Sequence, residues 1–193
     1  PLEGWAPVET PKIYEVALDT LLSSEYEELR QLLLRQLPAW NLPAATVDRV
    51  YTALLHDKSP NVRRTAMLAA GRNSYAAALP ALMTTLNAAE AQKPPVGDIR
   101  IETELAGGHS EAAIAALALG YLHHEPVRGV LKERVDKDPL YAVALALMGE
   151  TERLKEEHFA SKDNNQPLQL AAVEAVIRCK GAQGFPLLLK YKQ

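Results

Sequence analysis

The stretch 57–71, with the sequence DKSPNVRRTAMLAAG, decides the fold of this chain. Asp57 or Ser59 can accept hydrogen bonds from the free backbone N–H groups at a helix start, and Pro60 suits the first helical turn because its missing donor costs little there. Gly71 can adopt the left-handed conformation that ends a helix. The stretch therefore predicts one complete helix with its own start and end signals.

One face of this predicted helix consists of small apolar residues. Val62, Ala66, Ala69 and Ala70 recur at helical spacing, and alanines on such a face let a neighbouring helix approach closely. A second apolar stripe follows, which consists of Leu79, Leu82 and Leu86. The two stripes predict a packed pair of helices.

Weaker copies of this pattern recur downstream. Position 62 corresponds to positions 111, 140 and 168, at intervals of 49, 29 and 28 residues. Two of these intervals have the length of a helix pair with tight turns, whereas the longer one must contain an insertion. The aligned glycines are Gly71, Gly120 and Gly149. Self-similarity at a fixed period is typical of a solenoid of helical repeats.

The pattern resembles the HEAT repeat family, in its short bacterial and phycobilisome-lyase type, over roughly residues 43–192. The resemblance is carried by DKSPNVRRTAMLAAG and by the LPALMTTL that follows. It implies an all-α solenoid, a right-handed superhelix of antiparallel helix pairs, and a habit of binding proteins. In that family an Asp in the turn and an Arg early in the second helix form a ladder between repeats. Asp57 and Arg63 match these positions, but Tyr141 and Gln169 stand in the Arg place later, which argues against a continuous ladder.

The proline, glycine and apolar patterns predict the organisation of the whole chain. Residues 1–11 are expected to be extended, and residues 12–193 to form a single solenoid domain with an inserted loop at about 91–108. This loop is either a tolerated surface insertion or a contribution to binding, since insertions in repeat proteins collect on one face. About eleven helices are expected, at 12–22, 25–37, 43–56, 60–72, 75–89, 109–122, 125–136, 139–149, 151–160, 166–180 and 182–192.

Composition restricts the possible functions. The formal net charge of −3 and the pI near 6 argue against a general nucleic-acid binder, which shows a basic excess. Cys179 is the only cysteine, so no internal disulfide forms, and a buried small residue is the simplest reading of it. No membrane span or signal peptide is visible, and the chain starts at Pro1 without methionine. The compartment stays open, with a soluble, cytoplasmic protein favoured.

Enzymatic readings depend on histidine and carboxylate groups. These groups lie at 56–57, 109–111, 123–125 and 157–158, and such side chains bind iron or zinc when they converge. Some HEAT-type proteins are di-iron hydroxylases built on repeated His-Glu dipeptides, but only His124-Glu125 supplies that dipeptide here. We therefore expect no catalytic residue, metal or cofactor.

Two further HEAT-like classes are weighed in the same way. DNA alkyl-base glycosylases need a basic concave face with aromatic residues, whereas Trp5 and Trp40 lie near the start of this chain. Bilin lyases also use such repeats, and no residue here separates them from other members. An enzyme or lyase component that uses the His/Glu groups or the 91–108 loop remains the alternative.

The predicted function is a non-enzymatic scaffold that binds another protein, or another domain of a longer chain, through its concave face. In HEAT arrays the second helix of each pair lines that face, and here its outward stripe mixes apolar and charged residues. The same stripe can also be read as a merely solvated face. The predicted partner-binding residues are Arg64, Leu68, Arg72, Leu117, Tyr121, Glu174 and Arg178.

The run 183–191 is more apolar than one buried helix face requires, and it includes Phe185 and Leu189. It either folds back onto the preceding helix or contacts another domain or another copy, so self-association through this helix is also predicted.

Overall fold

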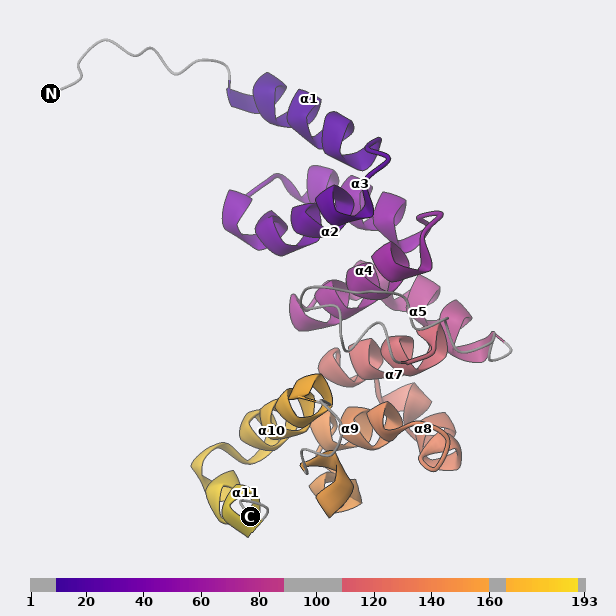
Figure 1. Cartoon of the computed structure of the whole chain (residues 1–193), viewed down its shortest axis with the longest axis vertical. Helices are drawn as coiled ribbons and strands as arrows, with labels where there is room; N and C mark the ends of the chain where they lie inside the picture. The colour runs from indigo at the N-terminus through magenta and orange to yellow at the C-terminus, as the bar shows by residue number, and fades with distance from the viewer. Residues whose placement is uncertain (1–9, 89–108, 160–165, 191–193) are drawn as a thin grey trace, which may run out of the picture.

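The structure is a computed structural model that describes residues 10–88, 109–159 and 166–190. Within these ranges all regular structure is helical, and the helices follow one another along the long axis of an elongated stack (Figure 1). The α-helices are α1 (Thr10–Leu22), α2 (Glu27–Gln36), α3 (Ala44–Leu55), α4 (Pro60–Arg72), α5 (Leu79–Asn87), α7 (Glu111–Tyr121), α8 (Arg128–Arg134), α9 (Pro139–Leu147), α10 (Gln166–Lys180) and α11 (Phe185–Lys190).

The helices pack as antiparallel pairs whose second members form a continuous layer. The first members are α1, α3, α5 and α8. They pack against α2, α4, α7 and α9, respectively. The second members pack on one another in the order α2, α4, α7, α9 and α10. We call the side formed by these five helices the second-helix face. This arrangement is the predicted all-α solenoid.

The start signal predicted for α4 is confirmed, and signals of the same kind precede two further second helices. The Ser59 side chain accepts a hydrogen bond from the N–H of Val62 at 3.5 Å, and Pro60 is the first residue of α4. Ser110 and Asp138 occupy the same position before α7 and α9 and accept the N–H groups of Ala113 and Leu140. The local sequence therefore sets where each second helix begins.

The residue that we predict to end α4 in a left-handed conformation, Gly71, is the wrong one. Gly71 lies inside α4, and the left-handed conformation belongs to Ser74, with φ 55°. His123 and Gly149 hold the same place after α7 and α9, with φ 49° and 104°. Gly149 therefore aligns with Ser74 and His123, and not with Gly71 and Gly120 as the sequence alignment assumed.

The two helical glycines have a packing role. A Cβ atom on Gly71 would lie 2.7 Å from the Cα of Ala118, and one on Gly120 would lie 2.8 Å from the Cα of Ala144. Contacts this short exclude any side chain, so α4 approaches α7, and α7 approaches α9, backbone to backbone. Helix α7 is buried from Ala112 to Tyr121 because α4, α5 and α9 all pack on it.

Ion pairs and hydrogen bonds link the turns of successive repeats. The Arg30 guanidinium of α2 donates two hydrogen bonds to the Asp57 carboxylate, at 2.7 and 3.0 Å, and the two side chains are 2% and 8% exposed. Arg63 donates to the Glu111 carboxylate at 2.6 and 3.1 Å and to the carbonyl oxygen of Asp57 at 2.7 Å. His109 bonds to Asp138 at 2.9 Å. Contacts of the kind that the resemblance implied thus link α2 to the turn before α4, α4 to the start of α7, and the turn before α7 to the turn before α9, with different residue types on the later links.

Two local predictions differ from the structure. The helix expected at 151–160 is replaced by two short 3-10 turns, Thr151–Arg153 and Glu156–His158, so the helix count departs slightly from eleven. Helix α1 begins at Thr10, inside the segment expected to be extended. Residues 1–9 and the predicted 91–108 loop lie outside the described residues.

The buried apolar side chains form one cluster that runs from Leu18 of α1 to Val176 of α10. Among the described residues, no helix combines the length and the apolar character that a bilayer crossing requires.

Candidate functional site

The structure separates the seven predicted partner-binding residues into two groups. Leu117 is fully buried, and Arg64 and Leu68 are 4% and 9% exposed. The outward register predicted for these three positions is wrong, because the folded chain buries all three side chains. The other four residues come together near the ends of α4 and α7 and on α10. They are Arg72, Tyr121, Glu174 and Arg178, which we call the Arg–Tyr–Glu cluster.

Helix packing places Arg72 and Tyr121 side by side. Arg72 directly follows Gly71, and Tyr121 directly follows Gly120. These are the two glycines at which neighbouring helices approach backbone to backbone. The Arg72 guanidinium carbon lies 5.7 Å from the centroid of the Tyr121 ring, and its Nε lies 3.4 Å from the phenol oxygen. The ring itself is only 3% exposed and acts as a rigid platform.

Helix α10 completes the cluster with two residues one turn apart. Glu174 accepts a hydrogen bond from the Tyr121 hydroxyl at 2.6 Å and one from Nε of Arg178 at 3.0 Å. The Arg178 guanidinium carbon lies 5.0 Å from the Tyr121 ring centroid, so both arginines make cation–π contacts with one ring. Helix α9 separates α7 from α10 in the stack, so the cluster joins residues that are more than a hundred positions apart in sequence, such as Arg72 and Glu174.

Burial and neighbouring charges set the protonation states in the cluster. Burial raises the pKa of Tyr121 to about 12, with a further rise from the hydrogen bond to Glu174 and an opposing effect of Arg72. Burial lowers the pKa of Arg72, but the interactions with Tyr121 and Glu174 outweigh it and the net shift is upward. Tyr121 is therefore neutral and Arg72 charged across the physiological range.

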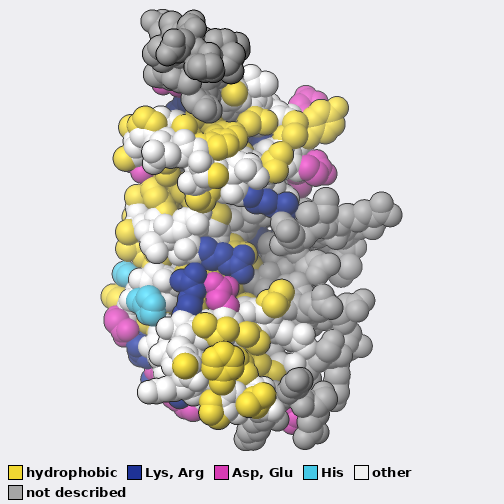
Figure 2. All heavy atoms as spheres, turned by 90° about the vertical axis from the view of Figure 1, so that its left-hand side faces the viewer, with side chains coloured by type: hydrophobic (Ala, Val, Ile, Leu, Met, Phe, Trp, Pro, Cys, Tyr) yellow, Lys and Arg dark blue, Asp and Glu magenta, His cyan; other side chains and the backbone are white. Residues whose placement is uncertain are grey.

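The cluster borders exposed apolar side chains. Leu170 and Ile177 lie on α10 at helical spacing from Glu174 and Arg178, and they are 67% and 48% exposed. Figure 2 shows this side of the molecule, where basic and acidic side chains gather in the middle with hydrophobic surface next to them. Charged donors and apolar contact area thus occur on one accessible surface.

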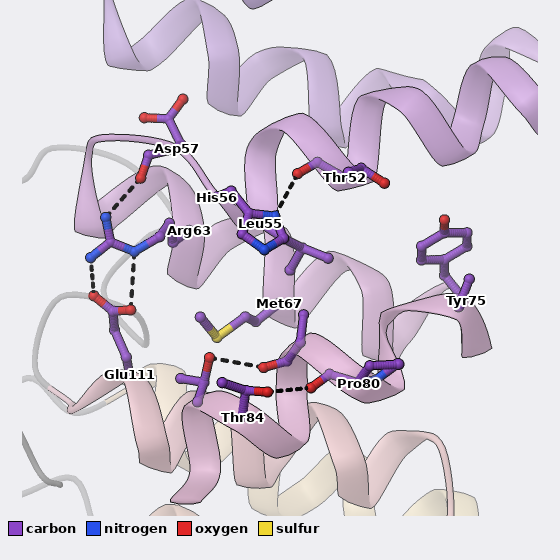
Figure 3. Close-up of a pocket in the computed structure, with 13 residues that line it drawn as sticks. Thr52, Leu55, His56, Asp57, Arg63, Met67, Tyr75, Pro80, Thr84 and Glu111 are labelled. Atoms are coloured by element: carbon purple, nitrogen blue, oxygen red, sulfur yellow. Dashed lines mark hydrogen bonds and ion pairs between the residues drawn. The ribbon is translucent and has the colours of Figure 1, made fainter. Parts of the chain in front are cut away.

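A groove of about 620 Å³ opens on the other side of α4, which sequence reasoning did not detect. Figure 3 shows Arg63 between Asp57 and Glu111 in its wall, with Tyr75 from the segment before α5. Its polar groups already bind protein atoms, since Arg63 binds Glu111 and Thr84 bonds to the carbonyl oxygen of Pro80. We therefore regard this groove as part of the scaffold between repeats.

The histidines with neighbouring carboxylates do not converge in the described ranges, where His, Cys, Asp and Glu form no group of three or more that could hold a metal ion. His109 bonds to Asp138, and His56 bonds through Nδ1 to the carbonyl oxygen of Thr52 at 2.9 Å. His158 is buried, and its Nδ1 accepts the N–H of Lys155 at 3.0 Å. Each of these rings has a local structural contact.

The single cysteine lies in the contact between α10 and the end of α9. Its thiol donates to the carbonyl oxygens of Ala146 and Leu147 at 2.8 and 3.1 Å. Burial raises the pKa of the Cys179 thiol. These properties are those of a packed, protonated residue.

Comparison with known proteins identifies the repeat. A family model described as HEAT repeats matches residues 14–93. Searches of curated proteins and of solved structures found no match. HEAT repeats generally serve as protein-interaction scaffolds and are typically non-enzymatic. The match shows HEAT repeats at residues 14–93, and the stacked helix pairs continue beyond them, so the chain is an all-α solenoid that contains HEAT repeats.

Proposed function

We propose that this chain is a non-enzymatic scaffold that binds a partner protein through the second-helix face, centred on the Arg–Tyr–Glu cluster. The observation that carries the proposal is that Arg72, Tyr121, Glu174 and Arg178, drawn from three helices, form one connected surface site. Arginine is enriched at the energetic centres of protein interfaces, because it combines apolar contact with directed hydrogen bonds.

The arrangement suits binding better than chemistry. The two guanidinium groups are 44% and 45% exposed at their side chains, so a partner can reach them. The Tyr121 ring beneath them is held by packing, so the ring itself loses little conformational entropy when a partner binds. A solenoid also offers a long, continuous surface on which such a site can be extended.

Differential capture from a lysate of the source organism tests the proposal. The full chain, the double variant Arg72→Glu/Arg178→Glu and the control variant Arg49→Glu/Lys132→Glu serve as baits, and bound proteins are quantified by mass spectrometry. Arg49 and Lys132 are half-exposed basic residues on α3 and α8, where Arg49 pairs with Asp19 and Lys132 is one of three basic partners of Glu150, so the control matches the charge change on first helices. We expect a protein that the wild type and the control retain and that the double variant loses.

The captured protein is then purified, and hydrogen exchange is measured with and without it. Protection at the ends of α4 and α7 and along α10 is the expected result. A set of captured proteins that is identical for the three baits, or protection confined to the first helices, would refute this site.

A further inference from the structure

We infer that the partner segment bound by the Arg–Tyr–Glu cluster is acidic and apolar, with carboxylates that dock on Arg72 and Arg178 and apolar side chains that cover Leu170 and Ile177. This inference rests on the function proposed above and adds the chemistry of the partner to it.

The charges of the cluster favour an acidic partner. Two guanidinium groups face one carboxylate, because Glu174 is the shared acceptor of Arg72 and Arg178. The Tyr121 hydroxyl is neutral and donates its proton to the same carboxylate at 2.6 Å. One positive charge is therefore left without compensation inside the cluster. Complementary charge across an interface selects partners and speeds their encounter.

The unused donors of the arginines point to a carboxylate as the ligand. Arg178 hydrogen-bonds through Nε alone, and Arg72 uses Nε and Nη2 at 3.4 Å each, near the limit for such a bond. Among the described residues, both Nη groups of Arg178 and Nη1 of Arg72 make no hydrogen bond. A carboxylate accepts two parallel N–H bonds from one guanidinium, so each arginine retains the donors for a partner carboxylate.

Exposed side chains on α10 indicate that the partner segment is also apolar. Leu170 and Ile177 flank Glu174 on the same side of the helix and are 67% and 48% exposed. Hydrophobic surface lies directly beside the charged group on this side of the molecule (Figure 2). A partner with carboxylates alone would leave this surface in water, and burying it adds affinity in proportion to its area.

A nucleic acid fits the same surface poorly. Binding to phosphates requires several basic groups along a stripe, whereas this cluster has two arginines with a carboxylate between them. The apolar neighbours on α10 also have no counterpart in a phosphate backbone.

Four labelled synthetic peptides of equal length test the inference by fluorescence anisotropy with the full chain. The first alternates Glu and Leu, the second replaces Leu by Ser, the third replaces Glu by Gln, and the fourth replaces Glu by Lys. We expect the Glu/Leu peptide to bind best and to lose affinity with added salt. We expect the Gln/Leu and Glu/Ser peptides to bind about tenfold more weakly, and the Lys/Leu peptide not to bind.

Variants of the chain localise the effect. Arg72→Gln/Arg178→Gln is expected to reduce Glu/Leu binding to the level of the Gln/Leu peptide, and Leu170→Ser/Ile177→Ser to the level of the Glu/Ser peptide. Glu174→Gln removes the competing carboxylate and keeps an acceptor for Tyr121, so it is expected to bind the Glu/Leu peptide about threefold or more tightly. The first-helix control Arg49→Glu/Lys132→Glu is expected to bind like wild type. Circular dichroism melts confirm that each variant is folded.

The outcomes separate this inference from the proposed function. Equal binding of the Glu/Leu and Gln/Leu peptides, or weaker binding by Glu174→Gln, would overturn the acidic preference. A captured partner that is lost with the arginines but binds through a basic or neutral segment would also overturn it, while the proposed function would stand. If no protein is lost from the Arg72→Glu/Arg178→Glu bait and no peptide binds, the proposed function and this inference both fail.

Discussion

Gly71 of α4 meets Ala118 of α7 with no room for a side chain between the two helices. A Cβ atom on the glycine would lie 2.7 Å from the Cα atom of Ala118 and 2.8 Å from its carbonyl oxygen. These atoms belong to the backbone, so the neighbour cannot relieve the contact by changing a rotamer. Gly120 repeats the relationship with Ala144 of α9.

Substitution of these glycines tests the close contact. We expect Gly71→Ala and Gly120→Ala each to lower the free energy of unfolding by about 1–3 kcal/mol, because overpacking forces the helices apart. Gly129→Ala in α8 is the matched control, since nothing lies within 4 Å of its added Cβ. It is expected to stabilise the protein by about 0.5–1 kcal/mol. Urea titration measures all three, and an unchanged midpoint for Gly71→Ala would refute the contact.

The buried ion pair between Arg30 and Asp57 is expected to be sensitive to the loss of one partner. Arg30→Leu leaves the Asp57 carboxylate, 8% exposed, without its guanidinium, and should cost about 3–5 kcal/mol. The exposed pair of Arg49 and Asp19 is the control, and Arg49→Leu should cost less than about 1 kcal/mol. Equal losses in thermal or urea unfolding would contradict the difference in burial.

His158 should make the fold sensitive to acid. Burial lowers the pKa of this histidine from its usual 6.5, so the unfolded chain binds its proton at a higher pH than the folded chain does. The stability that depends on the neutral ring is present above pH 6.5 and is lost as the pH falls towards the folded-state pKa. The free energy of unfolding is measured at pH 8 and pH 5, and His158→Gln should show a smaller loss than wild type. An equal loss in both proteins would contradict the buried position of the ring.

Tyr121 should resist deprotonation at alkaline pH. Its pKa is raised to about 12, chiefly by burial, whereas the unfolded chain has the ordinary value of 10.0. The folded state therefore holds this proton through the interval in which the unfolded state loses it, and stability falls as the pH rises from 10 to about 12. Difference ultraviolet titration of wild type against Tyr121→Phe measures the single phenol. A transition near pH 10 would indicate an exposed ring.

Self-association through the C-terminal helix stays a prediction. Phe185 and Leu189 of this helix are 59% and 65% exposed, and exposed apolar groups of this kind mark contact surfaces. We expect the sedimentation coefficient of the wild type to rise with protein concentration, and that of Phe185→Ser/Leu189→Ser to stay constant. A wild-type value that does not change with concentration would refute it.

Much of the fold follows from the sequence because the start signals are local. Ser59 and Pro60 determine the beginning of α4 through their own backbone and side-chain chemistry. The corresponding residues before α7 and α9 determine where those two helices begin. The helix ends were harder to predict, because a glycine selected for close packing and a glycine selected for a left-handed turn look alike in sequence. Gly71 is of the first kind and Gly149 of the second.

Prediction of the binding site from sequence is limited in the same way, because it cannot show how distant helices pack. Helical spacing selected Arg72, Tyr121, Glu174 and Arg178, and the structure brings these four side chains into contact, while their role in partner binding stays a prediction. It is wrong at Leu117, which is fully buried, because spacing within one helix does not show how the rest of the fold packs on that position. Arg30 was missed as the partner of Asp57, because it lies on α2, outside the aligned copies.

Because of the glycine contacts, the distances within the Arg–Tyr–Glu cluster depend on the spacing between repeats. Arg72 and Tyr121 each directly follow a glycine that sets how far one repeat stands from the next. Any change that widens this spacing, such as a bend of the whole array, must carry Arg72 away from the Tyr121 ring and from Glu174 on α10. Ligand binding at the cluster and the curvature of the solenoid are then mechanically linked, so pulling or bending one end of the array would alter affinity at a site near its middle.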